Sequence, residues 1–514
     1  MRLRYDRGSR PGAAILSLHA QLPRPARARH AARLGGACLL AVVLAGCIGP
    51  IAPVGPDHVA PAPALPPVWS VREDSGTARV DDFGPDTLVR WWEQLRDPAL
   101  SRLIDAALAA NPDLRAARAR VQQARALRAQ AAGGLFPSMS ASTAAIRNRP
   151  AGALTTSGTL HDVGFDAAWE IDLFGGTQRA IEAAGASLEA SRFNLEATRV
   201  SLAAEVALSH VDAIAYQRRL EIARANLASQ TETLRIVEWR HQAGLAAGSD
   251  VDQARTAREQ TRATLPDLES ARVAALNRLA VLLGRNPGEL ADLAPQGAEL
   301  PPLPASVATG IPADVLRRRP DLRAAERTLA AETARVGQTL ARRFPSLNLG
   351  ASFGWQAYSL GALGAAGTLA RAASGTLALT LFDGGRLRSA VEAQSAVQEQ
   401  ALIAYERAVL TALEEVENAL FTYAAGRERV DARRAAAEAA RSAARLTRDL
   451  YEAGLTDFPR VLETGRTLLA AEDALAQAEA AMRTSLIRLF KALGGGWDER
   501  APTLADRRTE PGKP

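Results

Sequence analysis

A long internal repeat is the feature that most constrains how this 514-residue chain can fold. The segment 112–117 (PDLRAA) recurs at 320–325, and 136–138 (FPS) recurs at 344–346, both at an offset of 208 residues. Later landmarks recur in the same order, with 243–245 (AGL) matched by 453–455 at an offset of 210. A repeat of this length indicates one structural unit that is used twice in each chain.

Each unit is predicted to contain a helix, two strands, a long helix, a turn and a last helix. The first helix begins at Pro112 or Pro320, because proline and aspartate suit a first helical turn. The segments 175–243 and 384–453 contain no proline, and about 70 helical residues rise about 100 Å. The shorter helices 113–135 and 249–283 together match that length, with a kink expected at Pro266. Helices this long favour a coiled-coil shaft or an α-helical barrel.

Period-2 alternation predicts two strand pairs, at about 138–172 and about 346–382. Four strands are too few to close a membrane barrel, and open strand edges are not tolerated in lipid. Twelve strands from three chains would close one, so the pattern favours a homotrimer. Near the last turn of each unit, leucines recur at helical spacing and predict a buried face. They are Leu276, Leu279 and Leu283, matched by Leu486, Leu489 and Leu493.

Residues 1–46 are predicted to be a lipoprotein signal peptide. A basic region is followed by an apolar run from Leu34 to Ala45, which is shorter than the ~20 residues that span a bilayer. The run ends in Leu-Ala-Gly-Cys, so Cys47 is the expected site of lipidation. An ordinary signal peptide with an incidental cysteine is the alternative, and the unusual length of the leader is compatible with a later translation start.

The net charge of +6 is carried by this leader, which holds eight arginines and one aspartate. Without it the chain has a charge of −1, so nucleic acid is not an expected partner. Cys38 and Cys47 are the two cysteines, so the mature chain is predicted to contain no disulfide. Residues 47–84 are rich in proline and are predicted to form an extended tether rather than core. The first repeat then covers 85–310, the second 311–497, and 498–514 form a disordered tail.

Several motifs resemble those of a known family along roughly residues 47–497. They include 54–57 (VGPD), 91–92 (WW), 111–114 (NPDL), 169–175 (WEIDLFG) and 492–497 (ALGGGW). The chain is similar to TolC-like outer membrane factors in their lipoprotein, NodT-type branch. The resemblance implies a mainly α fold with β strands: a trimer with a twelve-stranded outer-membrane barrel and a long periplasmic α-helical barrel.

The resemblance also implies a function. Such a protein is a passive duct of a tripartite efflux pump in a Gram-negative outer membrane. Its expected partners are outer-membrane lipid, a periplasmic adaptor and an inner-membrane pump of the resistance–nodulation–division (RND) class. No cofactor is expected, and the cargo and the cognate adaptor are not readable from this chain.

The turns between helices in each unit correspond to the periplasmic tip of that family. The adaptor is expected to dock at Gly244, Leu245, Gly454 and Leu455, although both glycines could simply end helices. The family closes its tip with acidic residues, and Glu463 stands at the corresponding place. Arg460 replaces a second acidic position and can pair with Glu463 at i,i+3 spacing. Asp250 and Asp252 are weaker gate candidates, since Asp250 can cap its own helix.

An enzyme, a scaffold lipoprotein and a different kind of export duct are the alternatives to an efflux duct. The six histidines are scattered, and the sequence contains no His-Glu-x-x-His motif, phosphate loop or nucleophile elbow, so no catalytic or metal site is predicted. A periplasmic coiled-coil scaffold lipoprotein would explain the helices but not the duplicated strands. An export duct of a type I secretion system stays within the same family.

Overall fold

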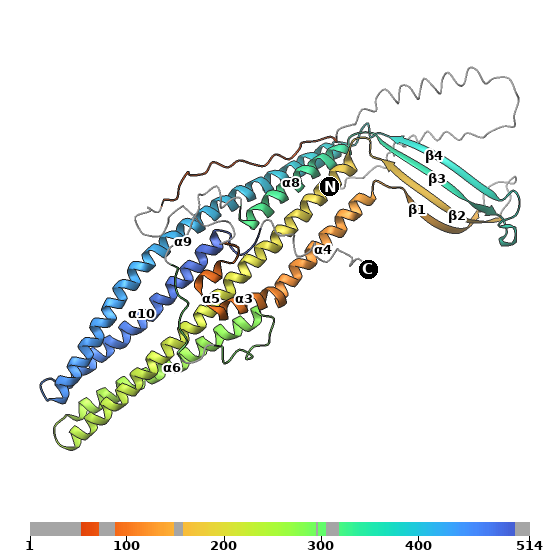
Figure 1. Ribbon diagram of the computed structural model, residues 1–514. Helices are drawn as coiled ribbons and strands as arrows, with labels where there is room; N and C mark the ends of the chain where they lie inside the picture. Colours follow the sequence, from red (N-terminus) through yellow and green to blue (C-terminus); the bar gives the residue numbers. More distant parts are fainter. Residues whose placement is uncertain (1–52, 71–87, 149–157, 294–296, 305–317, 499–514) are drawn as a thin grey trace, which may run out of the picture. The chain divides into compact units, whose positions relative to one another are not determined.

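The computed structural model describes residues 53–70, 88–148, 158–293, 297–304 and 318–498 (Figure 1). The signal peptide, Cys47 and the tail after Asp498 lie outside these ranges. The elements of the first repeat are η2 (Trp91–Leu95), α3 (Pro98–Ala110), α4 (Pro112–Gly133), β1 (Ser138–Asn148), β2 (Gly158–Ile171), α5 (Gly176–Gln242) and α6 (Gly248–Leu282). Those of the second are α8 (Pro320–Ala341), β3 (Ser346–Ala357), η3 (Leu360–Ala362), β4 (Leu369–Ala378), α9 (Arg386–Glu452) and α10 (Phe458–Ala492).

The two long helices confirm the predicted duplication. Helices α5 and α9 each contain 67 residues, which corresponds to about 100 Å of rise. Helices α4 and α6 pack along α5, while α8 and α10 pack along α9, so two shorter helices accompany each long one (Figure 1). Helix α5 also packs against α8 and α10, which joins the two repeats. Helix α6 continues through Pro266, so the proline does not end the helix.

The four strands form one antiparallel sheet in the order β1-β2-β3-β4. The central pair, β2 with β3, joins the two repeats, and Phe165 lies opposite Phe353. Among the described residues, β1 and β4 each pair on one side only. Strand β4 ends at Ala378, so the alternation seen in the sequence up to Leu381 continues beyond the strand.

The faces of the sheet differ in polarity. Phe165, Trp169 and Phe353 share one face and are about 40–50% exposed, which is unusual for large apolar side chains. Asp162 and Asp166 share the other face, where Asp162 accepts a hydrogen bond from the amide of Gln356 and Asp166 accepts one from the hydroxyl of Ser142. This division is what a sheet needs when one face meets lipid and the other meets water.

The main core lies where η2, α3 and the ends of α6 and α10 meet the middle of α5. Trp91 is fully buried, stacks on Phe490 at 5.2 Å and meets Trp92 edge-on at 5.8 Å. All six leucines that the helical spacing predicted to be buried belong to this core. Helix α3, which was not predicted as a separate element, is capped by Asp97, whose carboxylate accepts hydrogen bonds from the backbone N–H groups of Ala99 and Leu100.

Equivalent positions of the two repeats make the same contact with different side chains. Asn111 precedes α4 and donates to the carbonyl of Leu282 at 2.9 Å. Arg319 precedes α8 and donates to the carbonyl of Ala492 at 3.2 Å. Each contact ties the first helix of a repeat to the last carbonyls of its final helix, which have no partner within that helix. The two repeats therefore share the geometry of this contact, although the residue that makes it differs.

The proline-rich segment 53–70 is extended, as its prolines predict, but it is not separate from the folded body. His58 pairs with Glu326 at 2.6 Å, and both side chains are largely buried. Leu65 packs against the cluster around Leu322, and Trp69 packs against the main core. The prediction of a tether outside the core is thus wrong for this segment, because its apolar residues pack against the helices.

Among the described residues, no helix is both long and apolar enough to cross a bilayer.

A buried carboxyl on α5 leads to a prediction about pH. Glu196 is 6% exposed, and the salt bridge that it makes, to Arg199, is long at 3.8 Å. Burial raises the pKa of Glu196, although Arg199 and Arg118 oppose the shift. A carboxyl with a raised pKa in the folded state contributes stability at low pH and loses it as pH rises through that pKa. We expect Glu196→Gln to raise the melting temperature at pH 7.5 and to change it little at pH 4.5.

Glu205→Gln provides the control, because Glu205 is half-exposed, with 42% of its side chain accessible, and pairs with Arg278 near the surface. Surface pairs contribute about 0–1 kcal/mol, so this variant should melt close to the wild type or slightly below it. Thermal melts of the detergent-purified protein at both pH values measure the difference. A Glu196→Gln variant that is less stable than wild type at pH 7.5 would show that the carboxylate is stabilised as a charge.

Candidate functional site

Both long helices end in the same turn. Gly244 and Gly454 each have φ of +74°, a conformation that side-chain-bearing residues rarely adopt. The N–H of Leu245 donates to the carbonyl of Arg240, and that of Leu455 donates to Leu450, both at 2.8 Å. This six-to-one bond with a left-handed glycine is the Schellman arrangement, so the glycines are required by the turn itself. The structure places all four predicted docking residues at these turns.

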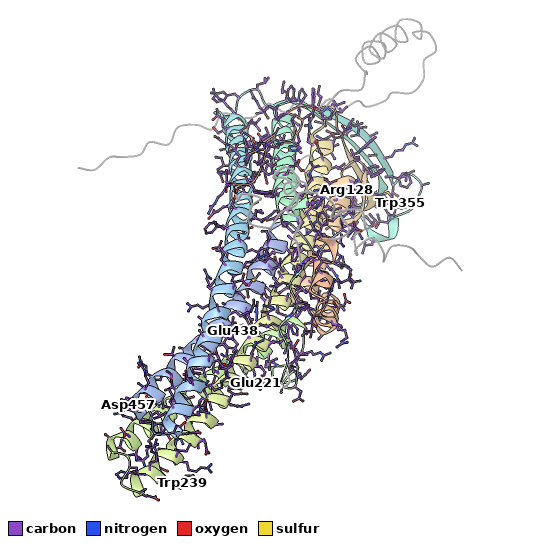
Figure 2. All side chains as sticks on the ribbon, turned by 60° about the vertical axis from the view of Figure 1, so that its left-hand side comes forward. Arg128, Glu221, Trp239, Trp355, Glu438 and Asp457 are labelled. Carbon is purple, nitrogen blue, oxygen red and sulfur yellow. The ribbon has the colours of Figure 1, made fainter. Side chains whose placement is uncertain are left out.

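The leucines of the turns point outward. Leu245 is 69% exposed and Leu455 is 74% exposed. Trp239, one turn before the end of α5 (Figure 2), is also exposed at 58%. The guanidinium of Arg235 lies over its ring. Exposed leucines and tryptophan at helical turns are available for contact with another protein.

A small apolar cluster joins the two turns, which are about 210 residues apart in the sequence. It contains residues from both hairpins: Leu234, Val237, Val251, Ala254, Tyr451, Phe458 and Val461. Arg240 adds a polar connection, since it donates to the carbonyl of Tyr451 at 3.0 Å and lies 4.5 Å from the centre of that ring. Burial raises the pKa of the Tyr451 hydroxyl, with Arg240 acting in the opposite direction. The two turns therefore form one packed unit, here called the helical tip.

The gate candidates lie at the start of the returning helices, where Asp250 is half-buried and the other three are exposed. Glu463 and Arg460 form the predicted i,i+3 pair, with 3.5 Å between their charged groups and both side chains more than 60% exposed. Asp250 accepts the N–H of Ala247 at 3.4 Å, so it caps α6 as the sequence allowed. Asp252 pairs with Arg255 at 3.3 Å within the same helix. Glu463 and Asp252 are thus each held by one exposed i,i+3 pair, whereas Asp250 also caps its helix.

A groove lies above the tip between α6 and α10, with α5 behind it. Its volume is about 520 Å³, and its walls include Thr261, Thr264, Asp267 and Arg466. Arg219 of α5 crosses to Asp473 of α10 at 2.6 and 3.1 Å and forms part of the wall. This two-point ion pair links the helices of the first repeat to those of the second.

The sequence marks the turns but not the residues that join them. Arg240, Tyr451 and Phe458 carry no motif, because their role depends on which hairpins become neighbours. The i,i+3 spacing of Leu234 and Val237 did mark a buried face, and it could have suggested a packing partner for the end of α5. No group of three metal-binding side chains occurs within the part of the chain that the structure describes.

Comparison with known proteins shows which family shares this architecture. The sequence profile described as "Outer membrane efflux protein" matches residues 103–285 and 311–495, one match for each repeat. The chain belongs to the outer membrane efflux protein family. The chain is 35% identical over 429 residues to the pyoverdine export outer membrane protein OpmQ of Pseudomonas aeruginosa, covering 81% of this chain and 89% of OpmQ.

Two further similarities support this membership. The chain is 31% identical to nodulation protein T of Rhizobium leguminosarum bv. trifolii, covering 89% of this chain and 96% of that protein. The structure of the outer-membrane channel OprN superposes with a TM-score of 0.80 at 36% identity, over 86% of this chain and 99% of OprN. As a member of this family of outer membrane efflux proteins, the chain is an outer-membrane channel of an efflux system. The duplicated strands and this membership together disfavour a scaffold lipoprotein.

Proposed function

We propose that this efflux channel works as a homotrimer that is anchored by lipid at Cys47 and docks a periplasmic adaptor at its helical tip. The observation that carries the proposal is the tip itself: two turns of identical geometry that present Leu245 and Leu455 to solvent. An adaptor that repeats the same contact on both turns would bind each chain twice. The inner-membrane pump would then be of the RND class, as the lipoprotein branch suggests.

The edges of the sheet support the trimer. A four-stranded sheet with an exposed apolar face and two edge strands leaves backbone N–H and C=O groups without partners in lipid. Pairing β1 of one chain with β4 of the next satisfies both edges, and three chains close a twelve-stranded barrel. The exposed apolar residues Leu410 and Phe421 of α9, each 68% exposed, favour additional contacts between chains along the helices.

Glu463 is proposed as the gate. Three copies around the axis of a trimer would repel one another and attract cations, since the pair with Arg460 is exposed and contributes little. We expect the purified trimer to show small, cation-selective conductance in planar bilayers. Glu463→Ala should raise the conductance several-fold and weaken its cation selectivity.

Glu438→Ala is the matched control, because Glu438 is an exposed carboxylate of α9 away from the turns (Figure 2). It should leave conductance close to that of the wild type. Equal conductance in all three proteins would keep the channel and remove Glu463 as its gate. A protein that neither conducts nor forms trimers would overturn the proposed assembly.

A further inference from the structure

The first residues of the segment 53–70, here called the N-terminal strap, are held by one buried arginine. The side chain of Arg179 on α5 is 5% exposed. Its guanidinium donates to the carbonyls of Pro53 at 3.3 Å, Val54 at 3.1 Å and Gly55 at 3.1 Å. It also pairs with Asp57 and with Glu182, each at 2.8 Å. Because a buried guanidinium needs partners for its donors, the strap is part of the folded structure at this point.

Glycines allow the strap to lie directly on the helices. A Cβ on Gly55, which has φ of +98°, would lie 2.4 Å from the Cα of Gly337 in α8. A Cβ on Gly337 would lie 2.8 Å from the carbonyl oxygen of Val54, and one on Gly175 would lie 2.5 Å from Pro53. The backbone of the strap therefore occupies space that any side chain would take. Such contacts require a fixed position rather than a loose association.

The strap is fixed next to the base of the sheet. The N–H of Val54 donates to the carbonyl of Phe174 at 3.1 Å, and Phe174 follows β2 by three residues. Phe174 stacks on Phe344, which precedes β3, at 4.8 Å. The strap thus meets the chain where both central strands leave the helices.

Chain length then limits where a lipid on Cys47 can be. Pro53 follows Cys47 by six positions, so the two lie at most about 20 Å apart. Without the contacts of Arg179, here called the clamp, the next attachment is His58, which pairs with Glu326 at 2.6 Å. The eleven Cα–Cα steps from Cys47 to His58 could reach about 40 Å. The clamp shortens the reach of the lipid about twofold and so confines it to a smaller volume.

We propose that Arg179 is a positioning residue that holds the lipidated N-terminus beside the base of the sheet, so that the lipid and the apolar face of the sheet meet the same membrane. The inference rests on the proposed lipidation of Cys47. Once the lipid is in the bilayer, contact of the sheet with the same bilayer is an intramolecular step. A short link between lipid and sheet raises the effective concentration of the sheet at the bilayer. A long link with the same lipid would attach the chain to the membrane without bringing the sheet close to it.

The test compares insertion into phosphatidylethanolamine–phosphatidylglycerol vesicles for chains with and without the lipid. Insertion is followed as the rate at which heat-resistant trimer appears, and mass spectrometry of the N-terminus records acylation. The first variant is Gly337→Ala, which displaces the strap, and its control is Gly133→Ala, which has open space around the added methyl. The second carries 15 inserted Gly and Ser residues between Ala52 and Pro53, which lengthens the link and leaves the clamp intact.

In acylated chains, we expect Gly337→Ala and the insertion each to slow insertion about five-fold or more, while Gly133→Ala inserts at the wild-type rate. In chains with Cys47→Ser, which carry no lipid, neither variant should slow insertion further. Equal slowing with and without lipid, or no slowing by the insertion, would show that the strap is only structural and would overturn the inference. Absence of acylation in the wild type would instead refute the proposed anchor, and the mass spectrum identifies that case separately.

Discussion

Trp91→Ala is expected to destabilise the channel by about 3–5 kcal/mol, the usual cost of removing a large aromatic side chain from a packed core. Trp91 is fully buried, and its ring stacks on Phe490 and meets Trp92. Gly495 also lies against it, since a Cβ there would be 3.0 Å from the ring. The variant would leave a cavity where η2 of the first repeat packs on α10 of the second. Side chains from one repeat alone could therefore not fill it.

The matched control is Trp239→Ala, which removes the same side chain from an exposed site on α5. It should change the unfolding free energy by less than about 1 kcal/mol. Unfolding of the detergent-purified proteins in guanidinium chloride and the yield of protein in the outer membrane measure both effects. If the two variants lose similar stability, the aromatic core around Trp91 is not what holds the repeats together.

The second large effect is expected at the tip. Leu245→Asp combined with Leu455→Asp should weaken binding of the cognate adaptor by 100-fold or more. Burying one leucine at an interface contributes about 1.5–3 kcal/mol, and two sites with a charge added at each exceed the 2.7 kcal/mol that corresponds to 100-fold. Both side chains are exposed, so the fold should remain intact. Surface plasmon resonance with the purified adaptor measures the affinity, and efflux from cells that depend on this channel measures its consequence.

Leu360→Asp serves as the control for charge on an exposed leucine, because Leu360 is 69% exposed in η3 between β3 and β4. Binding of the adaptor should be unaffected by it. Adaptor binding that survives the double change at the tip would place docking elsewhere, and the groove lined by Thr261 and Arg466 would be the next surface to examine.

Local chemistry explains how much of the fold was predictable. Proline at 112 and 320, glycine at 244 and 454, and the absence of proline between strands and turns fix where helices begin, end and continue. Alternation predicted β2, β3 and β4, apart from the end of β4, because Leu379 and Leu381 continue the pattern without a pairing partner in the sheet. Strand β1 alternates little and was only weakly indicated, as the first strand of its unit. These features depend on a few neighbouring residues, and a sequence displays them directly.

What was missed depends on contacts between distant segments. The clamp of Arg179 on the strap joins residues more than 120 positions apart, and prolines alone suggested only an extended chain there. At the tip, Arg240 donates a hydrogen bond to the carbonyl of Tyr451, which lies 211 positions away in the sequence, and no local pattern marks either residue. The roles of Gly244, Leu245, Gly454, Leu455 and Glu463 in docking and gating remain predictions, since geometry places these residues but does not assign their partners.

The strap also bears on the order of events during biogenesis. Its partners lie far downstream: Arg179 on α5, Glu326 on α8, and Glu417 on α9, the last at a separation of 347 residues. The segment that crosses the inner membrane first therefore has no complete docking surface until most of the chain has followed it. Contacts with such separations form late, because the intervening chain must be ordered before they can close. If Cys47 is lipidated, as proposed, the modification would thus precede the docking of the strap, while the first residues are still accessible.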